Sequence, residues 1–147
     1  MSEAVDHRAV AVRTYNAAWE LLEADRSAEQ DLDLLGLAMT SRYHWGFAGG
    51  GREVAVADWM ASRCCAAVGA GELAVSYADA ALARTEVGFP AWLLASLHEG
   101  RARAAAAVGD TGRRDRHVAA ARQELAREAD AEDRAVIEQQ LADLGGD

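Results

Sequence analysis

The sequence predicts an all-α fold, built from about seven helices arranged as antiparallel hairpins. Apolar residues recur at helical spacing through almost the whole chain, and alternating runs of β-branched residues are nearly absent. Short glycine-containing breaks separate the periodic segments. Helices of this length joined by a few residues pack as antiparallel neighbours, so we expect one helical domain over residues 1–147.

Each expected helix is bounded by a break in the pattern. Ser27 precedes the second helix as an N-cap, with Gln30 placed to complete a capping box. The GGG at 49–51 is the clearest break, and Pro90 stands where a first helical residue belongs. The expected helices cover residues 3–24, 28–48, 52–68, 72–87, 90–108, 113–129 and 131 to the Gly145–Gly146 pair.

Two segments have the pattern of a repeated helical hairpin. The stretch WMASRCCAAVGAGELAVSYADAALARTE (59–86) resembles a tetratricopeptide repeat, with Ser62 at the close approach of the two helices and Gly69 at their turn. A second stretch, LHEGRARAAAAVGDTGRRDRHVAAARQEL (97–125), is similar and lies about 40 residues further on, with Gly109 at its turn. The resemblance implies a right-handed superhelical array.

Four stretches, two of them within the hairpins just described, carry a broader resemblance. They are SRYHW (41–45), GELAVSYADAAL (71–82), LHEGRARAAAAVGD (97–110) and AEDRAVIEQQLADL (131–144). Together they resemble uncharacterised actinobacterial tetratricopeptide-like proteins over most of the chain from residue 30. Those proteins often have a histidine in an A-H-x-S arrangement, where this chain reads AMTS with Met39. The resemblance implies a helical-repeat fold and lends no activity.

The composition narrows the function classes. The net charge is −9, and the 15 basic residues are all arginine. The negative charge of the chain disfavours binding to nucleic acid. The lack of lysine excludes catalysis through a lysine Schiff base and phosphate binding by a Walker-type loop. The mean hydropathy is −0.14, no run of about 18 apolar residues occurs, and the N-terminus lacks a signal pattern. We therefore expect a cytoplasmic protein without membrane contact.

The cysteines and histidines give weak signals for metal or redox chemistry. Cys64 and Cys65 are adjacent, so on a helix they point about 100° apart and favour core packing over a disulfide or zinc site. Two histidines and one glutamate without a local motif do not define a metal site. We expect no cofactor and no metal.

Several polar residues interrupt the apolar stripes. Ser41 lies within the stripe of the second helix, with His44 at its edge, and Asn16 shares the stripe of the first helix. Glu99 lies among Ala95, Ala102 and Ala106, with His98 beside it. A buried carboxylate needs a partner, so we expect Glu99 to be buried and bonded to an Arg or His of another helix.

Two interpretations of these residues remain open. In the structural one, which we favour, Glu99 pairs with Arg103 or with an arginine of the next hairpin and fixes helix register. In the functional one, Asn16, His44, His98 and Glu99 converge on one pocket with Arg63, and His44, His98 and Glu99 are the candidate catalytic groups. His7 and His117, among charged neighbours, are expected to face solvent.

Trp59 and Arg63 form a second amphipathic face on the third helix, opposite Ala57, Ala61 and Cys64. Another helix of this chain, a peptide or a second copy could pack there, since Trp and Arg are frequent interface anchors. The leading hypothesis is therefore a helical-repeat interaction module that binds a protein partner or itself. The alternative is a small enzyme, or a small-molecule-binding protein of a biosynthetic pathway. The expected binding residues are Asn16, Ser41, Trp59 and Arg63.

Overall fold

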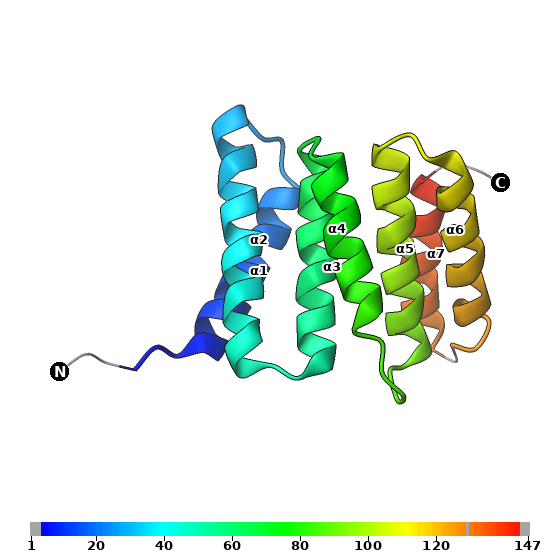
Figure 1. The fold of residues 1–147 in the computed structure, drawn as a ribbon, viewed down its shortest axis with the longest axis horizontal. Helices are drawn as coiled ribbons and strands as arrows, with labels where there is room; N and C mark the ends of the chain where they lie inside the picture. Colours follow the sequence, from blue (N-terminus) through cyan, green and yellow to red (C-terminus); the bar gives the residue numbers. More distant parts are fainter. Residues whose placement is uncertain (1–3, 129, 145–147) are drawn as a thin grey trace.

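Most of the chain that the structure describes is helical. The computed structural model describes residues 4–128 and 130–144, and these form seven helices and no strand (Figure 1). The expected all-α class is confirmed. The helices are α1 (His7–Leu22), α2 (Ala28–Ala48), α3 (Gly51–Ala67), α4 (Gly71–Ala83), α5 (Ala91–Ala107), α6 (Thr111–Leu125) and α7 (Ala131–Asp143).

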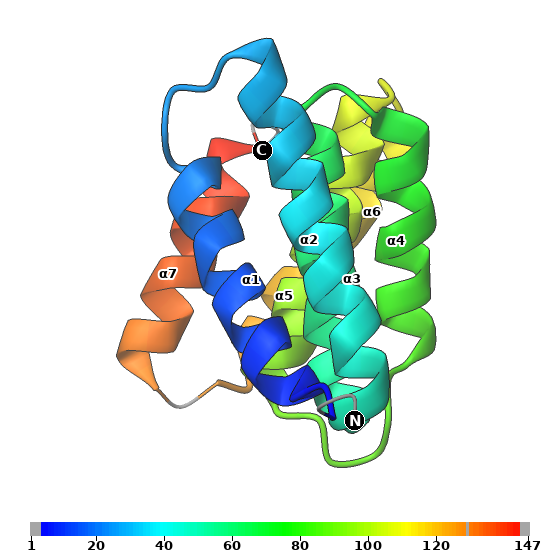
Figure 2. The same cartoon turned by 90° about the vertical axis from the view of Figure 1, so that its left-hand side faces the viewer.

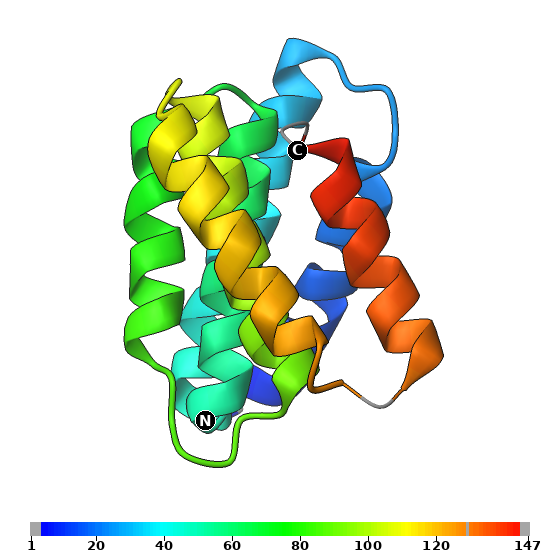
Figure 3. The ribbon, with the colours of Figure 1, turned by 90° about the vertical axis from the view of Figure 1, so that its right-hand side faces the viewer.

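The helices pair in chain order. The most extensive contacts are those of α1 with α2, α3 with α4, and α5 with α6. In addition, α1 contacts α3, α3 contacts α5, and α5 contacts α7, so the odd-numbered helices make a continuous layer. Figure 2 looks onto the end where α1 and α2 lie, and Figure 3 onto the opposite end, where α6 and α7 both lie against α5.

Side-chain N-caps mark the starts of α1, α2, α6 and α7, whereas the helix ends differ more from expectation. Ser27 and Gln30 form the expected reciprocal capping box at the start of α2. Asp6 caps α1, so that helix begins at His7. Pro90 is the N-cap of α5, not its first residue, because its ψ of 156° is extended. The α4 helix ends at Ala83, four residues earlier than expected.

Among the other helices, α6 differs most from its predicted bounds. The α6 helix spans Thr111–Leu125, shorter than the predicted 113–129 at its end and longer at its start. The predicted limits at residues 3, 129, 145 and 146 lie outside the described residues.

The core is dominated by small side chains. The sequence predicts a core that includes Trp19, Leu37, Trp45, Ala61, Cys64, Ala78 and Leu97. Of these residues, the last five are buried. Trp19 and Leu37 are only partly buried, because Trp19 faces a groove and Leu37 packs at the edge of the main cluster. Many alanines let the helix backbones approach one another closely.

In each of the first two hairpins, a buried serine joins the two helices. The Ser41 hydroxyl of α2 donates to the carbonyl of Ala11 in α1 at 2.9 Å. The Ser62 hydroxyl of α3 donates to the carbonyl of Ala74 in α4 at 2.7 Å. Ser41, expected as a binding residue, is therefore satisfied within the hairpin and 1% exposed.

A buried carboxylate that the sequence reasoning missed joins three helices. Asp58 of α3 is fully buried, and its two oxygens pair with Arg42 of α2 and with Arg84 at the end of α4, the latter at 2.6 Å. Both guanidinium groups remain partly exposed. Asp58 thereby fixes the register of α2 and α4 on α3.

Candidate functional site

A groove runs along the layer of odd-numbered helices. Its floor is formed by α3 and α5 and its walls by α1 and α7, which do not contact each other within the described residues. One end is an apolar pocket of about 320 Å³. A second depression, lined by the last turns of the same four helices, continues from it past Arg63 and Arg103.

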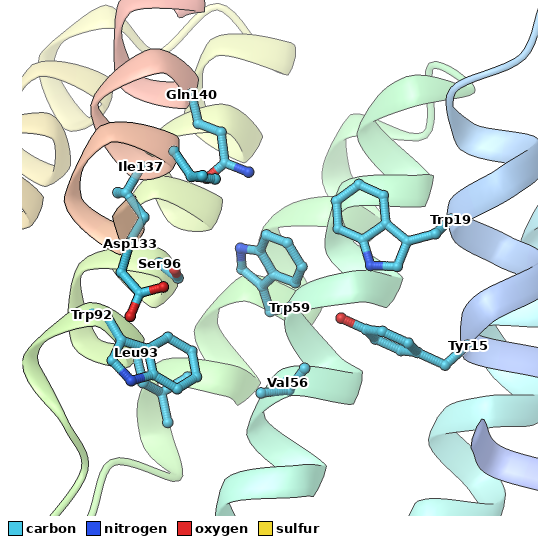
Figure 4. A pocket seen from close by; sticks show the side chains of 11 residues that line it. Tyr15, Trp19, Val56, Trp59, Trp92, Leu93, Ser96, Asp133, Ile137 and Gln140 are labelled. Carbon is cyan, nitrogen blue, oxygen red and sulfur yellow. The ribbon is translucent and has the colours of Figure 1, made fainter. Parts of the chain in front are cut away.

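The pocket is mainly aromatic. Figure 4 shows Tyr15 and Trp19 reaching in from α1, opposite Trp92, with Trp59 between them on the floor. The wall from α7 adds the apolar Ile137 and the polar Asp133 and Gln140. An apolar cavity with a few polar groups at its edge is the usual composition of a ligand site.

The position of Trp59 depends on a glycine. A Cβ atom on Gly100 would lie 2.5 Å from Cδ1 and 3.0 Å from Nε1 of Trp59. The indole therefore lies directly on the backbone of α5, where no other residue would leave space for it. Trp59 is 8% exposed and forms part of the pocket floor.

Glu99 links the pocket to the second depression. It is fully buried, and Oε1 accepts hydrogen bonds from Nη2 and Nε of Arg103 at 2.6 and 3.0 Å. Trp59 Nε1 donates to Oε2 at 3.4 Å, and Arg63 Nη1 lies 3.7 Å from Oε1. The expected burial and the pairing with Arg103 are confirmed. The expected hydrogen bond from an Arg or His of another helix is replaced by the one from Trp59.

Two guanidinium groups share this single carboxylate. Arg63 lies between two indoles, with Cζ 5.2 Å from the Trp19 ring centre and 5.7 Å from that of Trp59. Burial, followed by the nearby charge of Arg103, lowers the pKa of Arg63. Its Nη1 has no hydrogen-bond acceptor among the described residues. Burial in the pocket wall also raises the pKa of Tyr15.

The other candidate residues do not converge on Glu99. Asn16 is exposed on the outer face of α1. His44 pairs with His7 across the first hairpin, with 2.8 Å between their Nδ1 atoms. His98 pairs with His117 across the α5–α6 hairpin at 3.1 Å. The single pocket expected in the functional interpretation is not formed.

The histidine pairs also correct the expectation for His7 and His117. Both were expected to face solvent, but each is partly buried against another histidine. Their neighbours in sequence are charged, whereas their contacts come from a different helix. Only the packing of the hairpins brings the rings together.

The two cysteines are core side chains, as the sequence predicts. Cys64 and Cys65 are free and buried. Burial raises the pKa of Cys64 to about 12 and that of Cys65 to about 11, so neither forms the reactive thiolate at neutral pH. Among the described residues, no group of three or more His, Cys, Asp or Glu side chains is placed to hold a metal ion.

Comparisons with protein-family models, with curated proteins and with solved structures give no match for this chain. The site itself therefore supplies the functional argument. None of the described helices has the length and apolar character needed to cross a membrane.

Sequence reasoning identified Trp59 and Arg63 of the groove but missed its walls. Tyr15 and Trp92 each lie on a helix whose groove-facing side could not be assigned from periodicity alone. The α7 helix presents two apolar residues, Val136 and Ile137, beside the polar Gln140. This apolar strip is the one feature of the sequence that could have indicated a fourth helix in the lining. Arg103 was identified only as a partner of Glu99.

Proposed function

We propose that this protein is a helical-repeat interaction module that holds a segment of a partner protein in the groove between α1 and α7. The observation that carries the proposal is the aromatic pocket of about 320 Å³ over Trp59, open between two helices that do not contact each other. A large apolar side chain of the partner fills this pocket, as buried aromatic anchors do at interfaces. The rest of the segment follows the groove toward Arg63 and Arg103.

The charges support a segment of mixed polarity. The net charge of −9 favours encounter with a partner of basic character. Within the groove, Arg63 and Arg103 share one carboxylate, so N–H groups remain to donate to the carbonyl groups of a segment lying along them. Asp133, at the aromatic end, accepts from a donor on the segment.

The geometry favours this function over the alternative of a small enzyme. Glu99 is fully engaged by Arg103, Trp59 and Arg63, and so is not free to transfer a proton to a ligand. His44 and His98 lie in separate hairpins, away from the groove. A catalytic constellation needs its acid and base within reach of one reacting group.

We also propose that the hairpins form a tetratricopeptide-like, right-handed array. The support is the order of the contacts, in which consecutive helices pair and the first helix of each pair lines one continuous layer. In such arrays that layer is the concave binding face. An experimental structure in which the hairpins stack with the opposite hand would overturn this assignment.

The test selects peptides from a displayed random library against the wild-type protein and measures their affinity by tryptophan fluorescence. Three of the four tryptophans, namely Trp19, Trp59 and Trp92, line the pocket, so occupancy changes the emission. Because Trp59 is buried and its removal could unfold the chain, the informative variant is Val136→Glu. Val136 is 59% exposed and lies in the pocket wall.

The matched control is Val87→Glu, at a fully exposed valine in the connection between α4 and α5. We expect the selected peptides to bind wild type and Val87→Glu equally and to lose at least about tenfold in affinity for Val136→Glu. Equal binding to Val136→Glu would show that the groove is not the site. Concentration-dependent dimerisation in gel filtration, abolished by Val136→Glu and without peptide binding, would make the occupant a second copy of this chain.

A further inference from the structure

A basic cluster lies on the opposite side of α5 from the groove. His98 and Arg101 of α5, together with Arg113, Arg116 and His117 of α6, line an open depression of about 390 Å³. Asp79 of α4 is the one carboxylate in this lining. No part of the proposed groove is involved.

The charge of this cluster is opposite to that of the chain. Three guanidinium groups face one carboxylate, although the chain has a net charge of −9. Asp79 pairs with Arg101 at 2.7 Å, and Asp110 lies 3.6 Å from Arg113 in an exposed contact. No carboxylate of the described residues pairs with Arg116. The depression therefore retains positive charge after its internal pairs are counted.

Arg101 is buried more deeply than its single ion pair explains. Its side chain is 5% exposed, whereas that of its partner Asp79 is 59% exposed. Its Nη1 has no hydrogen-bond acceptor among the described residues. A buried guanidinium group with an unused donor is unfavourable unless another acceptor is supplied.

The two histidines supply one further donor when both are neutral and two when one ring is protonated. Their Nδ1 atoms are 3.1 Å apart, so in the neutral pair one ring donates there and keeps an unprotonated Nε2, while the other accepts and has its proton at Nε2. Protonation of the first ring places a donor at both Nε2 positions. Burial lowers the pKa of both rings, while Glu124 acts in the opposite direction on His98. The charges of Arg101 and Arg116 lower the pKa of His117 further, and Asp79 raises it.

We infer that this depression binds a phosphoryl group, held by Arg113 and Arg116 at its rim and by His98 and His117 over the buried charge of Arg101. A carboxylate has two oxygens, and this set of donors exceeds what two oxygens accept. A dianionic phosphoryl group, with three oxygens, matches both the donors and the positive charge that remains in the depression. The site goes beyond the proposed partner groove and does not depend on it.

The ligand is a small one. The depression has a volume of about 390 Å³. The surrounding chain is acidic, so an extended polyanion such as a nucleic acid or an anionic membrane would be repelled outside the cluster. Inorganic phosphate and the phosphomonoester group of a small metabolite share the chemistry required. The experiment distinguishes these two sources.

The test follows the imidazole signals by NMR at constant ionic strength, with chloride as the balancing anion. Inorganic phosphate and phosphoserine are titrated separately at pH 7.5. We expect saturable shifts of the His98 and His117 signals, while those of His7 and His44 stay unchanged as an internal control. The titrant with the lower dissociation constant identifies the source. A sulfate titration between pH 7.5 and 6 should show affinity rising as the pH falls, because the bound anion favours the protonated ring.

Two arginine variants on α6 complete the test. Arg116→Gln should weaken phosphate binding by roughly tenfold, since it removes a charged hydrogen bond. Arg122→Gln, an exposed position elsewhere on the same helix, should leave it unchanged. Equal shifts of all four histidines, or unchanged binding in Arg116→Gln, would overturn the inference. So would binding to vesicles containing phosphatidic acid without binding to phosphate or phosphoserine.

Discussion

Glu99 shows how one buried side chain organises its surroundings. Its carboxylate accepts from two nitrogens of Arg103 and from the Trp59 indole, and it lies near Arg63. The two arginine side chains are 23% and 19% exposed, so water screens them only in part. The carboxylate is therefore the local counter-charge that keeps both guanidinium groups in the groove.

Glu99→Gln should lower the free energy of unfolding by roughly 1–3 kcal/mol, because the amide keeps a similar shape but leaves two partly buried cations without their counter-charge. Chemical denaturation measures this change. Glu138→Gln, at an exposed position of α7, should have little effect. A fully stable Glu99→Gln protein would contradict the structural role assigned to the carboxylate.

The His98–His117 pair predicts a dependence of stability on pH. Burial lowers the pKa of both rings below the ordinary value of 6.5, so below that pH the unfolded chain binds more protons than the folded one. The contribution of this pair to the free energy of unfolding is fully present above pH 6.5. It is lost as the pH falls through the lowered pKa values of the two folded-state rings. Thermal unfolding between pH 7.5 and 5, without phosphate or sulfate, should show a shallower slope for His98→Gln than for wild type.

Residue chemistry could be predicted from the sequence where the partner was local. The burial of Glu99 and its pairing with Arg103 follow from the alanine stripe of one helix and a spacing of four residues. The pairing of His98 with His117, and of His44 with His7, could not be predicted, because each depends on the register between two helices. The same holds for Asp58, whose partners lie on two other helices.

At the scale of the elements, the contact between α3 and α5 depends on the absence of a side chain. Gly100→Ala should destabilise the protein, because the added methyl group would overlap Trp59 although alanine itself favours helix. Gly36→Ala is the matched control in α2, where nothing lies within 4 Å, and it should stabilise by roughly 0.5–1 kcal/mol. Thermal denaturation of both variants should therefore shift in opposite directions.

Helix boundaries were predictable where capping side chains mark them. The α2 helix has the expected bounds because Ser27 begins it and the glycines at 49–51 end it. The end of α4 was placed too late because no glycine or proline marks Ala83, and the next glycine with positive φ is Gly88. Local signals thus locate a start better than an unmarked end.

At the scale of the whole molecule, the helices differ in how fully they are enclosed. The α5 helix contacts α3, α4, α6 and α7, and nine of its residues are buried. Only Ile137 and Leu141 are buried in α7, which contacts α5 and α6. We expect amide hydrogen exchange to be slowest in α5, where it requires global unfolding, and faster in α7, which can open locally. Equal protection of the two helices would contradict this.

The groove as a whole was beyond sequence reasoning for the same reason. The sequence predicted an aromatic and basic face on α3, but its counterparts on α1, α5 and α7 depend on how the hairpins stack. The wall formed by α7 could not be predicted, because it depends on how the chain passes α6 and returns to pack against α5.

The place of α5 between the groove and the basic depression has a thermodynamic consequence. Glu99 and Gly100 face Trp59 on one side of this helix, while His98 and Arg101 line the depression on the other. Any displacement of α5 that accompanies occupancy of one side changes the geometry of the other. To that extent the two affinities are linked, and linkage is reciprocal: whatever factor a bound anion imposes on a partner in the groove, that partner imposes on the anion.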